Sequence, residues 1–392
     1  MKLYQILTLI LLTALPFFPR QLDPKIPYLI IAYALLLLPV AFTNIKRDLK
    51  HPLIIFFLLF LASAALSTLF SIDQKRSLIQ LATYVSYFVI FTSIGSVFAD
   101  TKSKERLALV FLLITSLLSL IALYNTLIAN YINREIAGVS FMWVYFGHNH
   151  LSALLLFAIP IAFYFVKKSW HSPRYQVPVL VTCHLSLVTL LLVALYFSFA
   201  RASMISLTAV SMIVLLSLIR KYDLKVIIGI LAVFLVIIGS YQAIVNPKQF
   251  GVRKVDLRNS ARVVYWQQAI ENAKNHPLFG TGLDTFRFIS FNSKEKALKT
   301  FYTHNFFLQM LSDTGIFGFL SSLLLIGSVL FKGAKQISHN IKNQSSIVNG
   351  QLSIVFFVAL LASTLNSLVD FDWQLPTVFL IFWMATALII DE

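Results

Sequence analysis

Long apolar runs separated by shorter polar segments dominate this sequence. A helix needs about 20 mainly apolar residues to cross roughly 30 Å of hydrocarbon. Runs near that length predict an all-α integral membrane protein with about 12 transmembrane helices. They cover residues 4–19, 27–43, 52–70, 78–98, 107–128, 148–166, 177–198, 202–219, 226–245, 306–331, 348–368 and 375–390. The first run follows Lys2 as a signal peptide would, but Pro16 to Pro19 make a poor cleavage site, so we expect an uncleaved helix.

The longest polar segment, residues 246–304, is the part of the chain large enough to fold outside a membrane. We therefore expect one polytopic membrane domain, residues 1–392, with residues 246–304 as its large outer loop. Helical spacing of apolar residues predicts an amphipathic helix from Ser260 to Asn275, which ends before a Gly280-Thr281-Gly282 turn. The apolar face of this helix is expected to comprise Val263, Trp266, Ile270 and Ala273.

Composition agrees with a membrane protein. Hydrophobic residues make up 58% of the chain and charged residues 12%, whereas soluble domains have about 45–50% and about 25%. This composition argues against a soluble enzyme. The net charge of +16 could suggest nucleic acid as a partner, but nucleic-acid-binding domains carry Lys and Arg on a water-facing surface, which is scarce here. The single cysteine, Cys183, permits neither an internal disulfide nor a thiolate metal cage.

The cations are distributed unequally between alternate loops, as expected for a protein whose short cytoplasmic loops are enriched in Lys and Arg. With a cytoplasmic N-terminus, the inner loops hold sixteen cations and the short outer loops hold six. The remaining ten lie in residues 246–304, and a long loop translocates largely regardless of its charge. We therefore expect both termini in the cytoplasm and residues 246–304 on the outer face.

Basic side chains at the outer ends of the runs are candidates for binding an anion, because ionisable groups at a membrane are costly to retain. Arg201 stands between two apolar runs; it either extends to the interface or clamps a phosphate, which suits a guanidinium. Arg258 and Arg262, four residues apart, form either a solvated basic face or a pair joined by an anion at a helix N-terminus. Lys75 and Arg76 occupy a short outer turn, where the orientation rule disfavours cations.

Histidines and acids flank the same outer ends. His304 opens the tenth run and could accept a hydroxyl proton near neutral pH, although a lone interfacial histidine is more often a polar cap. His148 and His150 form an H-x-H pair, but no cysteine or clustered carboxylate completes a zinc site, so we expect a polar lining. Asp370 and Asp372 either position a histidine or an arginine or are hydrated turn residues.

Taken together, several segments resemble the O-antigen ligase and O-antigen polymerase superfamily of polytopic glycan-transfer proteins. Each segment is short, and their order across about residues 140–390 is the more specific feature. The segments are Phe146-Gly-His-Asn-His-Leu-Ser-Ala153, Ser198-Phe-Ala-Arg-Ala-Ser203, Ser260-Ala-Arg-Val-Val-Tyr-Trp-Gln-Gln-Ala269, Asn275-His-Pro-Leu-Phe-Gly-Thr-Gly282, His304-Asn-Phe-Phe307, Gly315-Ile-Phe-Gly318 and Ser367-Leu-Val-Asp-Phe371. Asn366 departs from the pattern, because relatives often have a histidine before the Ser-x-x-Asp turn.

The resemblance implies a fold related to the GT-C membrane glycosyltransferases, in a bacterial inner membrane, with a cavity open to the periplasm and to lipid. It implies transfer of a glycan from undecaprenyl diphosphate to an acceptor such as lipid A-core, without nucleotide sugar, cofactor or metal. The family's two arginines fall on Arg201 and Arg262, and the histidine of its His-Asn motif falls on His304. The full candidate set adds Arg76 and Arg258 for the diphosphate and Asp370, His150 and Asn305 as supporting residues.

The expected chemistry is an inverting transfer in which the arginines stabilise the diphosphate and His304 activates the acceptor hydroxyl. A polymerase or a protein O-oligosaccharyltransferase of the same family is the alternative; the compact length and the end of the chain at Glu392 favour a ligase. A transporter or flippase of an anionic lipid-linked substrate is the alternative from another class. The sequence shows no repeat relating its two halves, which argues against a transporter.

Overall fold

The computed structural model describes residues 1–18, 23–48, 51–132, 148–170, 173, 177–198, 200–218, 261–292, 299–342 and 349–390. Every regular element in these ranges is helical. The predicted run 226–245 and the candidate Arg258 lie outside the described residues.

The described part of the chain consists of helices joined by turns where the connecting residues are described. In chain order the helices are α1 (Lys2–Ala14), η1 (Leu15–Phe17), α2 (Lys25–Asp48), α3 (Pro52–Leu69), α4 (Gln74–Val97), α5 (Thr101–Ile132), α7 (His148–Trp170), α8 (Val177–Phe197), α9 (Arg201–Leu218), α12 (Ala261–Asn275), α13 (Phe286–Phe291), α14 (Phe306–Lys342), α15 (Asn349–Ser367), η5 (Asp372–Gln374) and α16 (Pro376–Ile390).

Most of these helices have the length and composition of membrane spans. Among the described helices, seven (α2, α3, α4, α5, α7, α8 and α14) are long and apolar enough to cross a membrane, and α1, α9, α15 and α16 are shorter apolar helices. Each predicted run other than 226–245 coincides with one of them. Large apolar side chains such as Phe42, Leu69 and Val179 are exposed, as expected for surfaces that lipid covers. The protein is an all-α integral membrane protein, as predicted.

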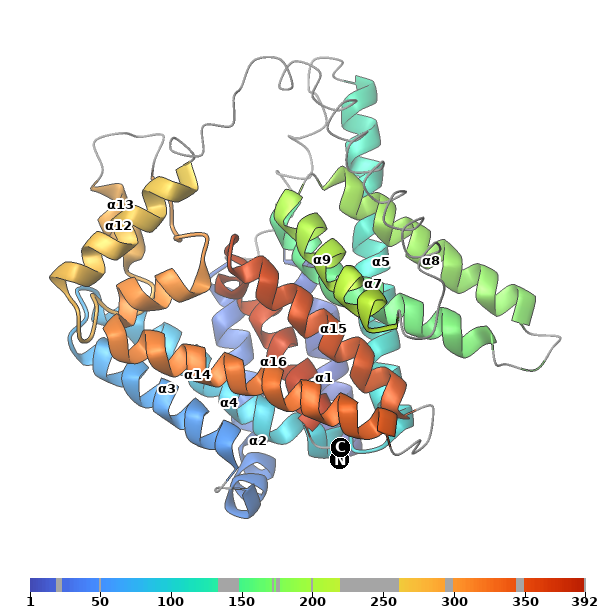
Figure 1. Ribbon diagram of the computed structural model, residues 1–392, viewed down its shortest axis with the longest axis horizontal. Helices are drawn as coiled ribbons and strands as arrows, with labels where there is room; N and C mark the ends of the chain where they lie inside the picture. Colours follow the sequence, from blue (N-terminus) through green and yellow to red (C-terminus); the bar gives the residue numbers. More distant parts are fainter. Residues whose placement is uncertain are drawn as a thin grey trace.

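The two termini lie at one end of the helix bundle, and the start of α4 lies at the other. The Gln5 side-chain amide donates to the Val97 carbonyl (2.7 Å), and Lys104 Nζ donates to the Leu388 carbonyl (3.1 Å). Both ends of the chain therefore meet the connection between α4 and α5, which Figure 1 shows at the bottom. Because the 24 residues of α4 span about 36 Å, its first residues lie a full membrane thickness away.

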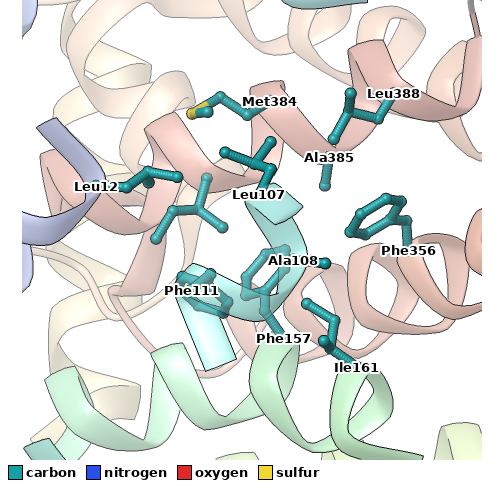
Figure 2. Close-up of a pocket in the computed structure, with 11 residues that line it drawn as sticks. Leu12, Leu107, Ala108, Phe111, Phe157, Ile161, Phe356, Met384, Ala385 and Leu388 are labelled. Carbon is teal, nitrogen blue, oxygen red and sulfur yellow. The ribbon is translucent and has the colours of Figure 1, made fainter. Parts of the chain in front are cut away.

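An aromatic cluster fills the centre of the bundle. The rings of Phe57 and Trp383 lie 4.4 Å apart, and Trp373 packs on Phe379 at 5.3 Å. A small gap of about 30 Å³ remains beside α16, lined only by apolar side chains from α1, α5, α7, α15 and α16 (Figure 2). Because water needs two or more polar partners, this gap is expected to be dry. It is a packing feature of the core and offers no polar group to a ligand.

Helix α14 is broken at Gly315, whereas the sequence predicted an uninterrupted span over 306–331. Gly315 has φ 65° and ψ −162°, so two helical segments join there. The segment that follows α12 packs directly against this break, with Ile316 N donating to the Pro277 carbonyl (2.8 Å) and Gly282 N to the Asp313 carbonyl (2.8 Å). A Cβ at position 315 would lie 2.4 Å from the Leu278 backbone, so glycine is required both by conformation and by contact.

Asp313 anchors the segment that follows α12 to α14. Its buried carboxylate accepts the backbone N–H groups of Asp284 (2.9 Å) and Phe286 (3.1 Å) and the Gln309 amide (2.8 Å). These bonds join the start of α13 to the first part of α14, and Figure 1 shows α12 and α13 beside that end of α14. The described residues between α12 and α14 are therefore docked on the membrane helices.

The loop helix forms almost where the sequence predicted it, but with a different buried face. α12 covers Ala261–Asn275, and its buried residues are Tyr265, Ala269, Asn272 and Ala273. Ile270, predicted to face inward, is 41% exposed. The prediction is confirmed for Ala273 and wrong for Ile270. Part of the contact is polar, since Asn272 Nδ2 donates to Ser312 Oγ (2.9 Å) and to the Ser312 carbonyl (3.0 Å). Apolar spacing alone could not reveal that interface.

Candidate functional site

Asp370 joins two of the predicted site residues at the end of the bundle away from the termini. It lies in the turn after α15, where its backbone N–H donates to the Asn366 carbonyl (2.9 Å). His304 Nδ1 lies 3.2 Å from Asp370 Oδ1, and Arg262 Nη2 lies 3.3 Å from Asp370 Oδ2. The Asp370 side chain is 2% exposed, against 20% for His304 and 41% for Arg262. The cluster therefore has a buried carboxylate and two partially exposed partners.

His304 is held in an unusual backbone conformation immediately before α14. Its φ is 56°, in the left-handed region, which costs a residue other than glycine about 1–2 kcal/mol. The ring stacks on Tyr265 at 5.7 Å and meets the edge of Phe371 at 4.7 Å. These contacts fix the ring between α12 and the turn after α15, with Nδ1 turned toward the carboxylate.

Asn305, predicted as a supporting residue, holds the beginning of α14 in place. Its Oδ1 accepts the Leu308 N–H (2.9 Å), and its Nδ2 donates to the Leu368 carbonyl (2.8 Å). The first contact satisfies a backbone donor that the helix start leaves open. The second ties α14 to the same turn that carries Asp370, so Asn305 helps to fix the spacing between Asp370 and His304.

The two acids of the last turn have opposite electrostatic character. Burial acts to raise the pKa of Asp370, but the His304 hydrogen bond and the charge of Arg262 outweigh it and hold the pKa below its usual value. Burial and the nearby charge of Asp370 raise the pKa of Asp372, which accepts a hydrogen bond from Asn366. The arrangement therefore favours an ionised Asp370 and a protonated Asp372.

The lowered pKa of Asp370 predicts a pH-dependent contribution to stability. In an acid whose pKa is lower when folded, this contribution is present above the unfolded pKa, about 3.9, and is lost as pH falls through the folded pKa. Asp370→Asn is expected to lower the free energy of unfolding by about 1–3 kcal/mol near pH 7. Thermal unfolding in detergent should show the difference from the original protein shrinking below about pH 4; a difference that does not change with pH would contradict this assignment.

Arg201 is the first residue of α9, and its side chain is exposed. It forms no ion pair with any residue that the structure describes. Ser203 Oγ and Ser152 Oγ lie 2.8 Å apart and join the starts of α9 and α7, and the His150 ring in α7 meets the edge of Phe371 at 5.8 Å. Arg201 therefore lies at the same end of the bundle as Asp370, with its charge available to a ligand. His150 packs on the ring of Phe371, which His304 also contacts.

Arg76 belongs to a second charged cluster rather than to the one around Asp370. Its Nη1 pairs with Asp284 Oδ2 (3.1 Å), and its Nε lies 3.7 Å from Asp73 Oδ2. Arg287 Nη2 contacts both oxygens of Asp284, at 2.8 and 3.0 Å, and its guanidinium lies over the Phe301 ring at 4.7 Å. Burial acts to lower the pKa of Arg287, but Asp284 and Tyr302 outweigh it and raise that pKa. Two acids thus offset the charge of Arg76.

Several residues of these clusters were not predicted. Tyr265 follows Arg262 by three positions, so their shared helix face was a usable signal in the sequence. Phe371 and Tyr302, whose rings stack at 5.8 Å, carry no such signal, because aromatic residues are abundant in this chain. Asp284 and Arg287 form an (i, i+3) ion pair, and that spacing of opposite charges was a second usable signal.

The fold and the cluster define a multi-pass helical membrane protein with a histidine, a carboxylate and an arginine joined at the end opposite its termini. Residues 186–323, which include Arg201, Arg262 and His304, match the family model described as O-antigen ligase. The predicted resemblance to the O-antigen ligase and polymerase superfamily is therefore confirmed.

Two curated proteins are similar to parts of the chain. The exopolysaccharide production protein ExoQ of Rhizobium meliloti is 26% identical over 138 residues, which are 33% of this chain and 31% of that protein. An uncharacterized protein of Haemophilus influenzae is 28% identical over 227 residues, 52% of this chain and 54% of that protein. The chain thus spans about a third of the length of the first relative and about half of the length of the second. Family and relative together support a glycan-transfer role of the ligase or polymerase type.

Proposed function

We propose that the protein is an O-antigen ligase-like glycosyltransferase of the bacterial inner membrane. It moves a glycan from undecaprenyl diphosphate to an acceptor hydroxyl, such as one on lipid A-core, at the periplasmic face, with both termini cytoplasmic and a GT-C-like arrangement of about twelve spans. The observation that carries the proposal is the joining of His304 and Arg262 through buried Asp370. The distribution of cations between the loops supports the orientation.

In the proposed reaction, His304 acts as the base. Its Nδ1 faces Asp370 (3.2 Å), so in a neutral ring Nδ1 carries the hydrogen and Nε2 is free to accept the acceptor's hydroxyl proton. As that proton leaves, the acceptor oxygen attacks the anomeric carbon from the face opposite the diphosphate. The bond from the anomeric carbon to the diphosphate oxygen breaks, and the diphosphate leaves with the electron pair. The product has inverted configuration.

Arg262 and Arg201 are the proposed partners of the leaving diphosphate. Arg262 uses one nitrogen for Asp370 and is 41% exposed, so its other N–H groups remain available to phosphate oxygens. The exposed Arg201 adds a second cation, and charge that grows on the diphosphate strengthens both contacts in the transition state. Arg76 adds little net charge because Asp284 and Asp73 offset it.

Reconstituted protein tests this proposal. Purified protein in vesicles is incubated with an undecaprenyl-diphosphate-linked glycan and lipid A-core, and the products are separated by size and by lipid. Glycan attached to lipid A-core is the expected result. Glycan attached only to protein indicates an oligosaccharyltransferase, and movement of the donor across the vesicle without any glycosidic product indicates a flippase; either outcome overturns the proposal.

A polymerase is the second candidate, and one observation favours it. The Rhizobium meliloti relative is named for exopolysaccharide production, and a polymer can grow by the same chemistry when the acceptor is a second lipid-linked repeat unit. Incubation with the lipid-linked glycan alone separates the two functions. Longer chains on undecaprenyl diphosphate identify a polymerase, whereas a ligase leaves the donor unextended.

A further inference from the structure

A cavity of about 780 Å³ lies beside the His304 cluster, between the beginnings of α2, α4 and α16 and the segment around Tyr302. Its volume is within the range of about 300–1,000 Å³ that is usual for ligand pockets. The lining includes Tyr28, Arg76, Asp284, Arg287, Tyr302 and Gln374. None of the residues in the proposed catalytic cluster, His304, Asp370 and Arg262, is among its lining residues.

Phe371 and Tyr302 connect this cavity to the proposed catalytic histidine. Tyr302 lines the cavity and stacks on Phe371 at 5.8 Å with the rings 15° apart. Phe371 also meets the His304 ring edge-on at 4.7 Å. Its backbone N–H donates to Asp370 Oδ1 (2.9 Å). A ligand in the cavity is thus separated from His304 by a wall of two aromatic rings.

Among the described residues, the charges of the lining balance, which sets this cavity apart from a diphosphate site. The cations Lys75, Arg76 and Arg287 face the acids Asp23, Asp73 and Asp284. Arg76 and Arg287 both pair with Asp284, so each guanidinium of the lining already has a counter-ion. A diphosphate needs an excess of positive charge. A balanced set of carboxylates and guanidinium groups instead offers hydrogen bonds to an uncharged molecule rich in hydroxyl groups.

Gln374 adds an unused amide to this lining. Neither its Nε2 nor its Oε1 has a hydrogen-bond partner among the described residues, and both atoms are buried. A buried polar group without a partner is unfavourable, so this amide is available to a ligand that enters the cavity that Gln374 lines. An amide supplies both donors and an acceptor to neighbouring hydroxyl groups. Tyr28, Phe301 and Tyr302 add aromatic surface to the lining.

We propose that this cavity binds an uncharged saccharide unit of a substrate and that Gln374 and Tyr28 determine which sugar it accepts. The inference rests on the proposed glycan transfer and extends it. Diphosphate and saccharide then occupy different places: the diphosphate meets Arg262 and Arg201, and the sugar fills the charge-balanced cavity on the other side of Phe371. The saccharide belongs either to the donor glycan or to the acceptor.

Steady-state kinetics with Gln374→Leu and Tyr28→Ala tests the proposal and distinguishes these two sources. We expect about a tenfold rise in KM for one substrate with kcat changed less than twofold, which corresponds to loss of a contact that is equally strong in the ground state and the transition state. A rise for the donor places donor sugar in the cavity, and a rise for the acceptor places acceptor sugar there. Gln267→Leu, the same change at an exposed glutamine of α12, should leave both KM values unchanged. Unchanged KM values in both cavity variants would overturn the proposal.

Direct binding separates failure of this inference from failure of the proposed reaction. The probes are the lipid-free oligosaccharide released from the donor by mild acid and the lipid-free core oligosaccharide, titrated by calorimetry into a His304→Asn background. One probe should bind, and Gln374→Leu should weaken it about tenfold. If the His304→Asn protein binds a probe with that dependence but the original protein transfers no glycan, the sugar site is retained and the transferase is rejected. Transfer by the original protein without such binding to the His304→Asn protein rejects the sugar site alone.

Discussion

Replacing His304 by alanine or by asparagine is expected to slow glycan transfer about 10²–10⁴-fold, the usual contribution of a general base. The reason is that no other base among the described residues contacts Asp370; its second partner, Arg262, offers hydrogen-bond donors and no acceptor. Asparagine is the more informative variant. It tolerates the left-handed backbone seen at position 304 (φ 56°), and its amide can still donate to Asp370, but it cannot take up a proton.

The measurement is the initial rate of glycan attachment at saturating donor and acceptor, with folding followed by thermal unfolding in detergent. His276→Ala is the matched control, because His276 is an exposed histidine outside the cluster. It should retain the original rate. If His304→Asn retained most of the activity while His304→Ala lost it, His304 would be a positioning residue rather than the base, and the proposed mechanism would be wrong.

Replacing Arg262 by alanine is expected to reduce kcat about 10²–10³-fold, as loss of one preorganised donor to a developing negative charge does elsewhere. Two effects add in the same direction. The diphosphate loses a cation, and Asp370 loses its guanidinium partner. Arg262→Lys should recover part of the rate, because lysine keeps the charge but lacks the planar fork that binds two phosphate oxygens at once.

Lys274→Ala provides the control for charge alone. Lys274 is an exposed cation at the other end of α12, so its removal changes the net charge of the helix without touching Asp370. We expect the rate to remain within about twofold of the original, because exposed charges a Debye length or more from the site are screened. Equal losses in Arg262→Ala and Lys274→Ala would mean that general electrostatic attraction, rather than a specific contact, explains the effect.

Arg262 and Gly315 differ in whether a substitution is expected to affect mainly the rate of transfer or mainly the folded structure. Arg262 is partially exposed and packs at the beginning of α12, while the burial of that helix depends on Ala269 and Asn272. Its loss should therefore leave the α12 contacts in place, but it removes one partner of buried Asp370, so we expect a modest fall in the unfolding temperature with the protein still folded at the assay temperature. A substitution at Gly315 is expected to disturb the structure, because any side chain there meets the Leu278 backbone and would separate the segment that follows α12 from α14.

The sequence by itself determined the class of the protein and the approximate positions of its apolar helices. Apolar run length identifies membrane-spanning segments because hydrocarbon offers the backbone no hydrogen-bond partner. An ionisable residue at the limit of an apolar run is visible in sequence for the same reason, which is how Arg201 and His304 became candidates; Arg262 became one through its four-residue spacing from Arg258. These are local signals, and each depends only on a residue and its neighbours along the chain.

Only the tertiary structure decided which candidates meet. Asp370 is 66 residues from His304 and 108 from Arg262, and no local pattern indicates that one carboxylate contacts both. The buried face of α12, the break at Gly315 and the cavity beside Tyr302 likewise depend on contacts between distant segments. Polar and small residues make these contacts, and the sequence does not reveal which distant residue each of them will contact. The site is therefore a property of the packing, and its separation into a charged cluster and a charge-balanced cavity could be recognised only there.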